Sequence, residues 1–353
     1  MKKLLIICRQ PFGRLVDIYK WCEHLGNDYQ VEVISFANNQ RVDFIKDNVT
    51  VHEVSNSGNR VIRGLRFFVV SLWHILFFRG SIIVEFFSGC EIFKTIFPWK
   101  EMTLDIRTLS VVKDDKERNE WDERIKKAVK LFDHITVISD GVKQFLGLED
   151  SKAYTIPLGA DVMSETDKDF QTIRLLYIGT FNNRDLDKTI KGFAIFVRKN
   201  PTLDIHYDIV GDGLNNELQE YKQLVLDLNL NEYVTFYGSR PHTELKQYLD
   251  RCNIGVAFVP VTSYYHHQPS TKIYEYALSG LYSIATSTYS NKRIINEHNG
   301  IIINDDAEAF AEALEYINKN KRAFNSNAIR STLKDCLWKN IVCNYLEDFL
   351  SKH

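Results

Sequence analysis

The stretch HHQPSTKIYEYALSGLYSIAT, residues 266–286, predicts a loop, a helix, a tight turn and a strand in succession. Pro269 breaks the loop, and Ser270 or Thr271 can cap a helix whose apolar residues recur at helical spacing. Gly280 ends that helix, and the apolar run LYSIAT follows as a short strand. A helix that leads directly into an apolar strand is typical of alternating α/β folds.

Two side chains of opposite charge project from the start of this helix. Lys272 lies in the first turn, where the macrodipole disfavours an exposed cation by roughly 0.3–1 kcal/mol, and Glu275 follows on the same face. A diphosphate would relieve that conflict by accepting hydrogen bonds from the backbone N–H groups after Ser270 and Thr271 and from Lys272. Glu275 could then accept from both ribose hydroxyls of a nucleotide. The alternative, which the helix alone favours, is a surface Lys272–Glu275 pair worth at most about 0.5 kcal/mol.

Composition bounds the class of protein. The chain has 353 residues, which is long enough for two domains with a core each. With 44% hydrophobic and 25% charged residues, it has the composition of a folded protein and not that of a disordered one. Its formal net charge of -2 argues against nucleic-acid binding, so an anionic ligand must be met by a local patch of positive charge.

Six cysteines are scattered without a CxxC pair, which indicates a reducing, cytoplasmic compartment and no cysteine zinc site. No stretch reaches the ~20 apolar residues that a membrane-spanning helix needs. The pairs His266 and His267, and Asp185 and Asp187, resemble metal motifs. Adjacent histidines point in different directions and the aspartates stand at a helix start, so we interpret both as incidental and predict no metal.

Apolar strands alternate with amphipathic helices over the first half of the chain. The candidate strands are KLLIIC, VEVISF, TVHEV, SIIVEFF, MTLDIR, HITVIS and AYTIP, and helical patterns such as LVDIYKWCEHL and DERIKKAVKLF lie between several of them. This order predicts a mostly parallel sheet with helices on both faces. Ligands of such sheets lie beyond the carboxyl ends of the strands.

Two loops at predicted carboxyl ends carry candidate site residues. Gly13, after the first strand, could let backbone approach a ligand, but a lone glycine without a GxGxxG pattern is also typical of a plain turn. Asp105 and Arg107 end the strand MTLDIR, which places charge where a substrate would lie. The alternative for these two is a mutual ion pair at the surface, and the sequence leaves both interpretations open.

A basic and aromatic stretch, RVIRGLRFFVVSLWHILFFR, runs from Arg60 to Arg79 with four arginines and no acidic residue. Its apolar part is too short to span a bilayer, but its flanks suit a surface that touches anionic lipid. The alternative is a helix buried in the first domain with its arginines at the exposed ends. The pattern slightly favours peripheral membrane contact.

Apolar periodicity is lost between Ile156 and Ile173, where small and charged residues gather as they do in a linker. A second alternating series follows, with the strands IRLLYIG, IHYDIVGDG, YVTFYGS, NIGVAFVP, LYSIAT and GIIIN. We therefore predict one α/β domain over 1–160, a second over 170–335 and a terminal helix over 336–353.

The second half is similar to a known family in the order of its motifs. YIGTFNNRDLDKTIKGF, IVGDG, VTFYGSRPHTELKQYL, NIGVAFVP and PSTKIYEYALSG resemble the nucleotide-sugar domain of retaining GT-B glycosyltransferases of the large family-four group, glycosyl transferases group 1. FDHITVISDGVKQFL and YTIPLGAD resemble the segment before their domain linker. The resemblance covers most of the chain from about Leu104 onward. It implies two Rossmann-like domains, acceptor-side and then donor-side, with a cleft between them and a C-terminal helix that crosses back to the first.

The resemblance also implies roles for residues of a donor site. Glu275 matches the second glutamate of the family's pair, which binds the donor ribose. Its partner position falls on His267, where the family usually has a glutamate that meets the donor sugar. Arg184 falls at or near the family's phosphate-binding lysine, so Arg184 and Lys272 would take up the charge of the leaving group.

Further donor-site positions follow in the same way. Gly179 resembles the glycine that lets its loop approach the sugar phosphate, and Thr180 or Phe181 stands where the family usually has an arginine. Ser239 and Arg240 occupy the loop that usually frames the base. With Ser270 and Thr271 at the helix start, these residues complete the predicted donor site.

The reaction that the resemblance implies is transfer of a sugar, with retained anomeric configuration, from a nucleotide sugar to a saccharide acceptor. Asp105 or Arg107 lies where the family often places a polar residue near the sugar and the acceptor. Such enzymes generally work without a bound metal, and no cofactor is expected. The stretch from Arg60 to Arg79 fits a polyprenyl-linked acceptor at the inner face of the cytoplasmic membrane. Because His267 departs from the family, a nucleotide-sugar-binding protein without transfer and a GT-B epimerase stay open as alternatives.

Overall fold

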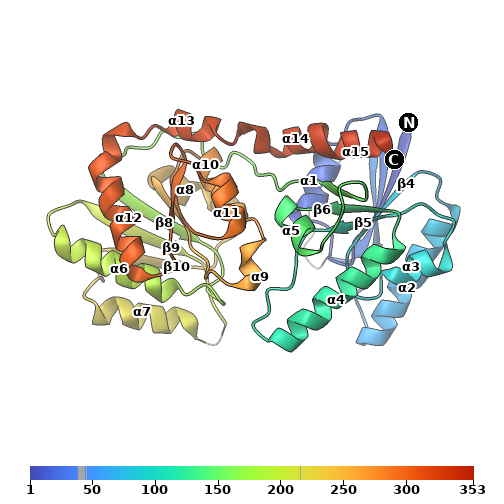
Figure 1. Cartoon of the computed structure of the whole chain (residues 1–353), viewed down its shortest axis with the longest axis horizontal. Helices are drawn as coiled ribbons and strands as arrows, with labels where there is room; N and C mark the ends of the chain where they lie inside the picture. Colours follow the sequence, from blue (N-terminus) through green and yellow to red (C-terminus); the bar gives the residue numbers. More distant parts are fainter. Residues whose placement is uncertain (39–43, 45, 215) are drawn as a thin grey trace. The chain divides into compact units, whose positions relative to one another are not determined.

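The chain is described by a computed structural model that covers residues 1–38, 44, 46–214 and 216–353. These residues divide into two compact units. The first unit consists of Met1–Gly159 together with Trp338–His353, and the second consists of Ala160–Leu337. In each unit, helices flank a parallel sheet (Figure 1).

The described strands of the first unit form one parallel sheet in the order β3-β2-β1-β4-β5-β6-β7. They are β1 (Lys2–Ile7), β2 (Tyr29–Phe36), β3 (Val49–Val54), β4 (Ser81–Glu85), β5 (Thr103–Ile106), β6 (His134–Val137) and β7 (Ala153–Thr155). Each matches one of the apolar runs of the first half, so the predicted α/β sheet is confirmed. The strand order reverses between β1 and β4, and open sheets of this kind bind ligands at such a switch point.

The helices of the first unit before its last segment are α1 (Val16–His24), α2 (Arg60–Phe77), α3 (Glu91–Ile96), α4 (Asp115–Leu131) and α5 (Asp140–Phe145). Three of them begin at a capping side chain. Asn59, Asp114 and Ser139 accept hydrogen bonds from backbone N–H groups in the first turns of α2, α4 and α5. Such caps satisfy donors that a helix start leaves without a partner.

The helix α2 covers the basic stretch and is only partly buried. Phe67, Ser71 and Ile75 are its buried residues, whereas several large apolar side chains on other faces are exposed. The alternative of a buried helix with only its ends exposed is therefore wrong. Among the described residues, no helix is long and apolar enough to cross a membrane.

The last segment of the chain belongs to the first unit. It consists of α14 (Trp338–Ile341), a π-helical turn (Val342–Leu346) and α15 (Glu347–Lys352), and it contacts α1. The backbone N–H of Gly26 donates to Glu347 Oε1 at 3.1 Å, and the Tyr154 hydroxyl donates to Asp348 Oδ2 at 2.8 Å. These hydrogen bonds and the buried Trp338 tie the segment to the first sheet and its helices.

The described strands of the second unit form a parallel sheet in the order β10-β9-β8-β11-β12-β13. They are β8 (Ile173–Ile178), β9 (Ile205–Val210), β10 (Val234–Gly238), β11 (Ile254–Ala257), β12 (Tyr282–Thr286) and β13 (Gly300–Ile303). Its α-helices are α6 (Leu186–Lys199), α7 (Glu217–Asp227), α8 (Lys246–Arg251), α9 (Ser263–His266), α10 (Thr271–Leu278), α11 (Tyr289–Ile294), α12 (Ala307–Asn320) and α13 (Ser326–Ser331). Short 3₁₀ turns lie at His242–Glu244, Lys321–Ala323 and Lys334–Cys336. The predicted second series of strands is confirmed.

The helix α10 packs unusually close to the sheet. A Cβ atom on Gly255 of β11 would lie 2.3 Å from the Tyr276 ring, so only glycine leaves room for that ring. Tyr276 is fully buried, and its hydroxyl accepts a hydrogen bond from the Ile178 N–H of β8 at 3.0 Å. One aromatic side chain therefore fixes α10 against two neighbouring strands, which sets the position of its amino end.

We expect Gly255→Ala to destabilise the second unit by about 1–3 kcal/mol, because the added methyl group forces the buried Tyr276 ring out of place. Calorimetric unfolding measures the loss. Tryptophan fluorescence shows which unit is destabilised, because all five tryptophans lie in the first unit. The unfolding midpoint followed by fluorescence should therefore be the same in the variant and the parent protein. Gly64→Ala is the control, because its Cβ would meet nothing nearer than 3.8 Å. Equal stability of Gly255→Ala and the parent protein would contradict the packing argument.

Candidate functional site

The amino end of α10 lies where the loop from β11 leads into the helix. Ser270 is its N-cap residue with extended backbone angles, φ -87° and ψ 115°, and its side chain makes no capping hydrogen bond. The end of the helix is therefore not closed by its own cap, and backbone N–H groups there suit an anion. Thr271 is exposed and Ser270 is half-buried, so both remain accessible to a ligand.

Lys272 and Glu275 pair with each other in the structure. The distance from Lys272 Nζ to Glu275 Oε2 is 2.7 Å, and their side chains are 28% and 12% exposed. The pair is thus more buried than the surface pair considered from the sequence. Each side chain neutralises the other, and a nucleotide diphosphate would have to separate them in order to bind both. Their roles toward phosphate and ribose stay predictions.

The loop after β8 adopts backbone conformations that most residues avoid. Asn183 and Asp185 have positive φ angles of 59° and 50°, and Asp185 stands directly before α6. The end of β9 approaches this loop so closely that a Cβ on Gly211 would lie 1.8 Å from the Gly179 carbonyl oxygen. Such strain is stored most often at ligand sites. Gly211 was not among the predicted site residues, although it is the first glycine of the IVGDG motif that the sequence shows.

Three predicted residues of this loop have different environments. Phe181 is fully buried and contacts the rings of Tyr177 and Tyr221, so it cannot stand in for a ligand-facing arginine. Thr180 is exposed and is the one of that predicted pair that can meet a ligand. The Arg184 guanidinium lies 4.6 Å from the ring centroid of Tyr265, and this cation–π contact fixes its direction.

His267 follows α9 and packs among aromatic rings. Its ring centroid lies 5.0 Å from that of His266 and 5.2 Å from that of Tyr289. Burial lowers the pKa of His267, and the neighbouring His266 lowers it further. Near neutral pH the imidazole is therefore uncharged. The predicted contact of His267 with a donor sugar stays a prediction.

Ser239 and Arg240 lie apart from α10 in the sheet order. They follow β10, which is an edge strand, and β9 and β8 stand between it and the strand β11 that leads to α10. Both residues are exposed, and Arg240 pairs loosely with Glu244 at 3.9 Å. Their predicted contact with the base stays a prediction.

Asp105 and Arg107 are buried in the first unit, so the alternative of a mutual ion pair at the surface is wrong in its location. Arg107 donates to the Asp17 carboxylate and to the Ile156 carbonyl, the latter at 2.8 Å, and its Nη1 lies 3.8 Å from Asp105. Thr136 donates to Asp105 Oδ1 at 2.8 Å. The cause is the inner position of β5, whose end α1 covers with Asp17. Direct contact of either residue with a substrate stays a prediction.

Gly13 lies in the turn between β1 and α1. Its φ angle of 87° is in the left-handed region, so the turn requires glycine or a residue that tolerates this conformation. The Arg14 N–H donates to the Pro11 carbonyl at 3.0 Å and closes the turn. The structure explains Gly13 as a turn residue, and its predicted approach to a ligand stays a prediction.

Sequence reasoning missed Glu85, at the carboxyl end of β4 and beside the switch point. Its Oε2 is buried without a hydrogen-bond partner among the described residues, and Asp105 is its register neighbour on β5. Burial raises the pKa of Glu85 to about 8, and the charge of Asp105 adds to the effect. Burial also raises the pKa of Asp105 to about 6 against the opposing pull of Arg107. A carboxyl that titrates near neutrality can donate or accept a proton.

Known proteins resemble this chain in the sequence of its second unit and in its fold. Residues 172–320 match the family model described as Glycosyl transferases group 1. No curated protein sequence matches the chain. Among solved structures, sucrose-phosphate synthase from Thermosynechococcus elongatus superposes with a TM-score of 0.77 at 17% identity, covering 100% of this chain and 99% of that chain. HepE from Anabaena in complex with UDP superposes with a TM-score of 0.76 at 14% identity, covering 100% of this chain and 100% of that chain. The lipopolysaccharide outer core galactosyltransferase WaaB superposes with a TM-score of 0.71 at 16% identity, again covering 100% of both chains.

The class of protein follows from the fold and the family match together. The chain has the GT-B fold, with two Rossmann-like units. Residues 172–320 match the model of the glycosyl transferases group 1 family. The family resemblance inferred from the motifs is thereby confirmed for the second unit.

Glu85 makes the stability of the first unit depend on pH. Between its ordinary pKa of 4.5 and its raised pKa of about 8, the folded carboxyl keeps its proton while the unfolded one is ionised. The folded state then binds more protons, so the free energy of unfolding falls as pH rises, by up to ~1.4 kcal/mol per pH unit. We expect Glu85→Gln to flatten this fall between pH 6 and 8, as measured by urea unfolding with tryptophan fluorescence.

The control is Glu120→Gln, which removes an exposed carboxylate of α4 and should keep the pH dependence of the parent protein. If Glu85→Gln and the parent protein lost stability equally over that range, Glu85 would be ionised in the folded protein and the argument would fail.

Proposed function

We propose that this protein is a retaining glycosyltransferase that moves a hexosyl group from a nucleoside diphosphate sugar to a lipid-linked saccharide in cell-surface polysaccharide synthesis. The observation that carries the proposal is the family match over residues 172–320, which includes both the strained loop after β8 and the open amino end of α10. Solved structures of HepE hold UDP or UDP-glucose, which makes uridine nucleotides the first ligands to test. WaaB, which has a similar fold, is a lipopolysaccharide outer core galactosyltransferase, and this agrees with an acceptor of the cell surface.

The charge that develops during transfer suits the donor-side residues. Breaking the bond between sugar and diphosphate leaves negative charge on the diphosphate, and fixed cations with a helix amino end stabilise that charge without reorganisation. Lys272 and Arg184 are the cations in this role, with the N–H groups after Ser270. Two positive side chains and a helix end make a metal unnecessary for the transfer. The acceptor hydroxyl attacks on the face that the diphosphate leaves and passes its proton to the departing phosphate.

The exposed face of α2 supports a lipid-linked acceptor. Val61, Leu65, Val69, Trp73 and Phe77 are between 57% and 77% exposed, and most recur at helical spacing. Large apolar side chains that gather on an exposed face indicate an interaction site, and the flanking arginines suit the headgroups of anionic lipids. The proposed location is the inner face of the cytoplasmic membrane.

Basic side chains gather at the amino end of α2. Burial lowers the pKa of Arg9, and the charges of Arg60 and Arg63 lower it further, so the three guanidinium groups repel one another. A phosphate group would relieve this repulsion and accept hydrogen bonds from the arginines. The phosphate of a lipid-linked saccharide is such a group.

Nucleotide release separates transfer from the alternatives that His267 raises. The protein is incubated with UDP-glucose, with other UDP-sugars, and with or without polyprenyl-linked saccharides. Release of UDP only with an acceptor supports transfer. Binding of UDP-glucose without any turnover would favour a nucleotide-sugar-binding protein, and conversion of a UDP-sugar into its epimer without an acceptor and without net release of UDP would favour an epimerase.

We expect Lys272→Ala to weaken binding of UDP by about 1.5–3 kcal/mol, the size of a hydrogen bond to a charged group, with nearly unchanged thermal stability. Calorimetric titration with UDP, GDP and ADP, first without metal and then with magnesium, measures the affinity. Lys246→Ala is the matched control, because this exposed lysine also pairs with a carboxylate within its helix. Equal nucleotide affinity of Lys272→Ala and the parent protein would leave Lys272 with no role beyond its pair with Glu275.

We expect the double variant Val69→Glu, Trp73→Glu to lose vesicle binding at least ~tenfold, because each buried apolar side chain contributes about 1.5–3 kcal/mol. Flotation with phosphatidylglycerol vesicles at low and high salt measures the bound fraction. Leu226→Glu is the control, since it changes an exposed apolar residue of α7 in the other unit. Retention of the parent protein in the soluble fraction at every lipid content and salt concentration would end the membrane proposal.

A further inference from the structure

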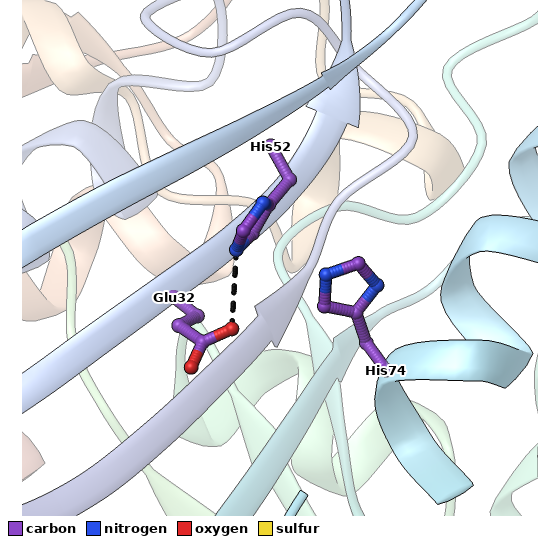
Figure 2. A group of neighbouring side chains, drawn as sticks. All are labelled: Glu32, His52 and His74. Carbon is purple, nitrogen blue, oxygen red and sulfur yellow. Dashed lines mark hydrogen bonds and ion pairs between the residues drawn. The ribbon is translucent and has the colours of Figure 1, made fainter. Parts of the chain in front are cut away.

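Three side chains that can bind metal converge beside the edge of the first sheet (Figure 2). Glu32 comes from β2, His52 from the edge strand β3 and His74 from α2. Their ligand atoms, one from each residue, all lie within 4.8 Å of one another. His52 Nε2 is 3.1 Å from Glu32 Oε2, and the ring centroids of His52 and His74 are 4.5 Å apart.

The sheet register places Glu32 and His52 on one face. His52 stands opposite Ile34, and Glu32 lies two residues before Ile34, so the two side chains are diagonal neighbours on the same side of the sheet. The helix α2 contacts both strands and brings His74 over that side. Figure 2 shows the His74 ring projecting from α2 toward His52.

A backbone hydrogen bond prepares His74 for a metal. Its Nδ1 lies 2.9 Å from the Val70 carbonyl oxygen, which can only accept, so Nδ1 carries the proton and donates. Nε2 then has a free lone pair in the neutral ring. Metal-bound histidines commonly donate their second ring nitrogen to a carbonyl in this way, which fixes both tautomer and orientation.

We propose that Glu32, His52 and His74 bind one divalent transition-metal ion, with Zn²⁺ as the first candidate. Two imidazoles and one carboxylate form a ligand set typical of zinc, and water can complete a tetrahedron. Ligand atoms around tetrahedral zinc lie roughly 3.3 Å apart, close to the observed 3.1 Å between His52 and Glu32. The side chains of His52 and Glu32 are 33% and 26% exposed, which leaves a path for the ion and its water.

The ion would link α2 to two strands at the edge of the sheet. The buried residues of this helix are Phe67, Ser71 and Ile75, so apolar packing holds it to the sheet at few points. A cross-link from His74 to β2 and β3 would add another point of attachment. Because binding favours the folded state, the metal would raise the stability of the first unit. The proposal is independent of sugar transfer, and its test needs no activity measurement.

The test uses untagged protein of residues 1–353, treated with a chelator and then titrated with ZnCl₂ against a coloured zinc indicator. We expect one tight equivalent, which His52→Gln and His74→Gln each weaken at least ~tenfold, since even outer-shell changes cost ~10–100-fold in metal affinity. Zinc should raise the unfolding midpoint, followed by tryptophan fluorescence, for the parent protein and not for these variants. Co²⁺ in place of zinc should give the visible absorption of a tetrahedral site.

The matched control is His134→Gln, because Glu101, His134 and His353 form a second, more exposed group of possible ligands. This variant should keep the tight equivalent and the zinc-dependent midpoint. Stability without zinc separates a folding defect from a lost ligand, so variants and parent protein are also compared in excess chelator. The proposal is overturned if the parent protein binds no zinc tightly, if His74→Gln binds it as well as the parent protein, or if only His134→Gln loses it.

Discussion

The close contact between Gly255 and Tyr276 is the constraint on which the donor side depends. In a parallel sheet, each strand leads from its carboxyl end into a helix, so helix amino ends gather along one edge of the sheet. The missing side chain at Gly255 lets α10 sit deep against β11, and the Tyr276 hydroxyl ties it to β8. The end of α10 and the loop after β8 are thus held by one side chain. A displaced Tyr276 would move the proposed diphosphate-binding groups relative to one another.

Electrostatics shapes the first unit in a different way. Asp17, Asp105 and Glu85 lie near the carboxyl ends of the inner strands, and Arg107 is the cation that contacts two of them. One guanidinium cannot satisfy three carboxyl groups, so burial raises the pKa of the two that it compensates least. The sheet therefore holds titratable groups near neutrality beside its switch point, which is an arrangement more often found at functional sites than in a structural core.

The fold was predictable because apolar runs and amphipathic helices alternate along nearly the whole chain, and such patterns report local structure directly. The start of α10 was predictable for the same reason. Contacts between residues that lie far apart in the sequence were not predictable from these local patterns. The charges at the end of β5 suggested a surface, whereas α1 brings Asp17 over Arg107 and buries it. Phe181 and Thr180 are adjacent in sequence, and only packing decides which one is exposed. Glu85 was hidden within an apolar run, and Glu32, His52 and His74 come from three separate elements.

The helix α2 carries both the proposed metal ligand His74 and the proposed membrane-binding face, so the two proposals depend on the same element. Its sheet-facing side presents Phe67, Ser71 and Ile75 with His74 beside them, and its other side presents exposed apolar residues such as Leu65 and Trp73. A helix with so few buried residues gains little from the core, although most of a helix's stability in a protein comes from the packing of its apolar face. Contact with lipid on one side and a metal cross-link on the other would each reduce that deficit. Because both act on the same helix, an ion that holds α2 on the sheet would also keep its apolar face in one orientation for the membrane.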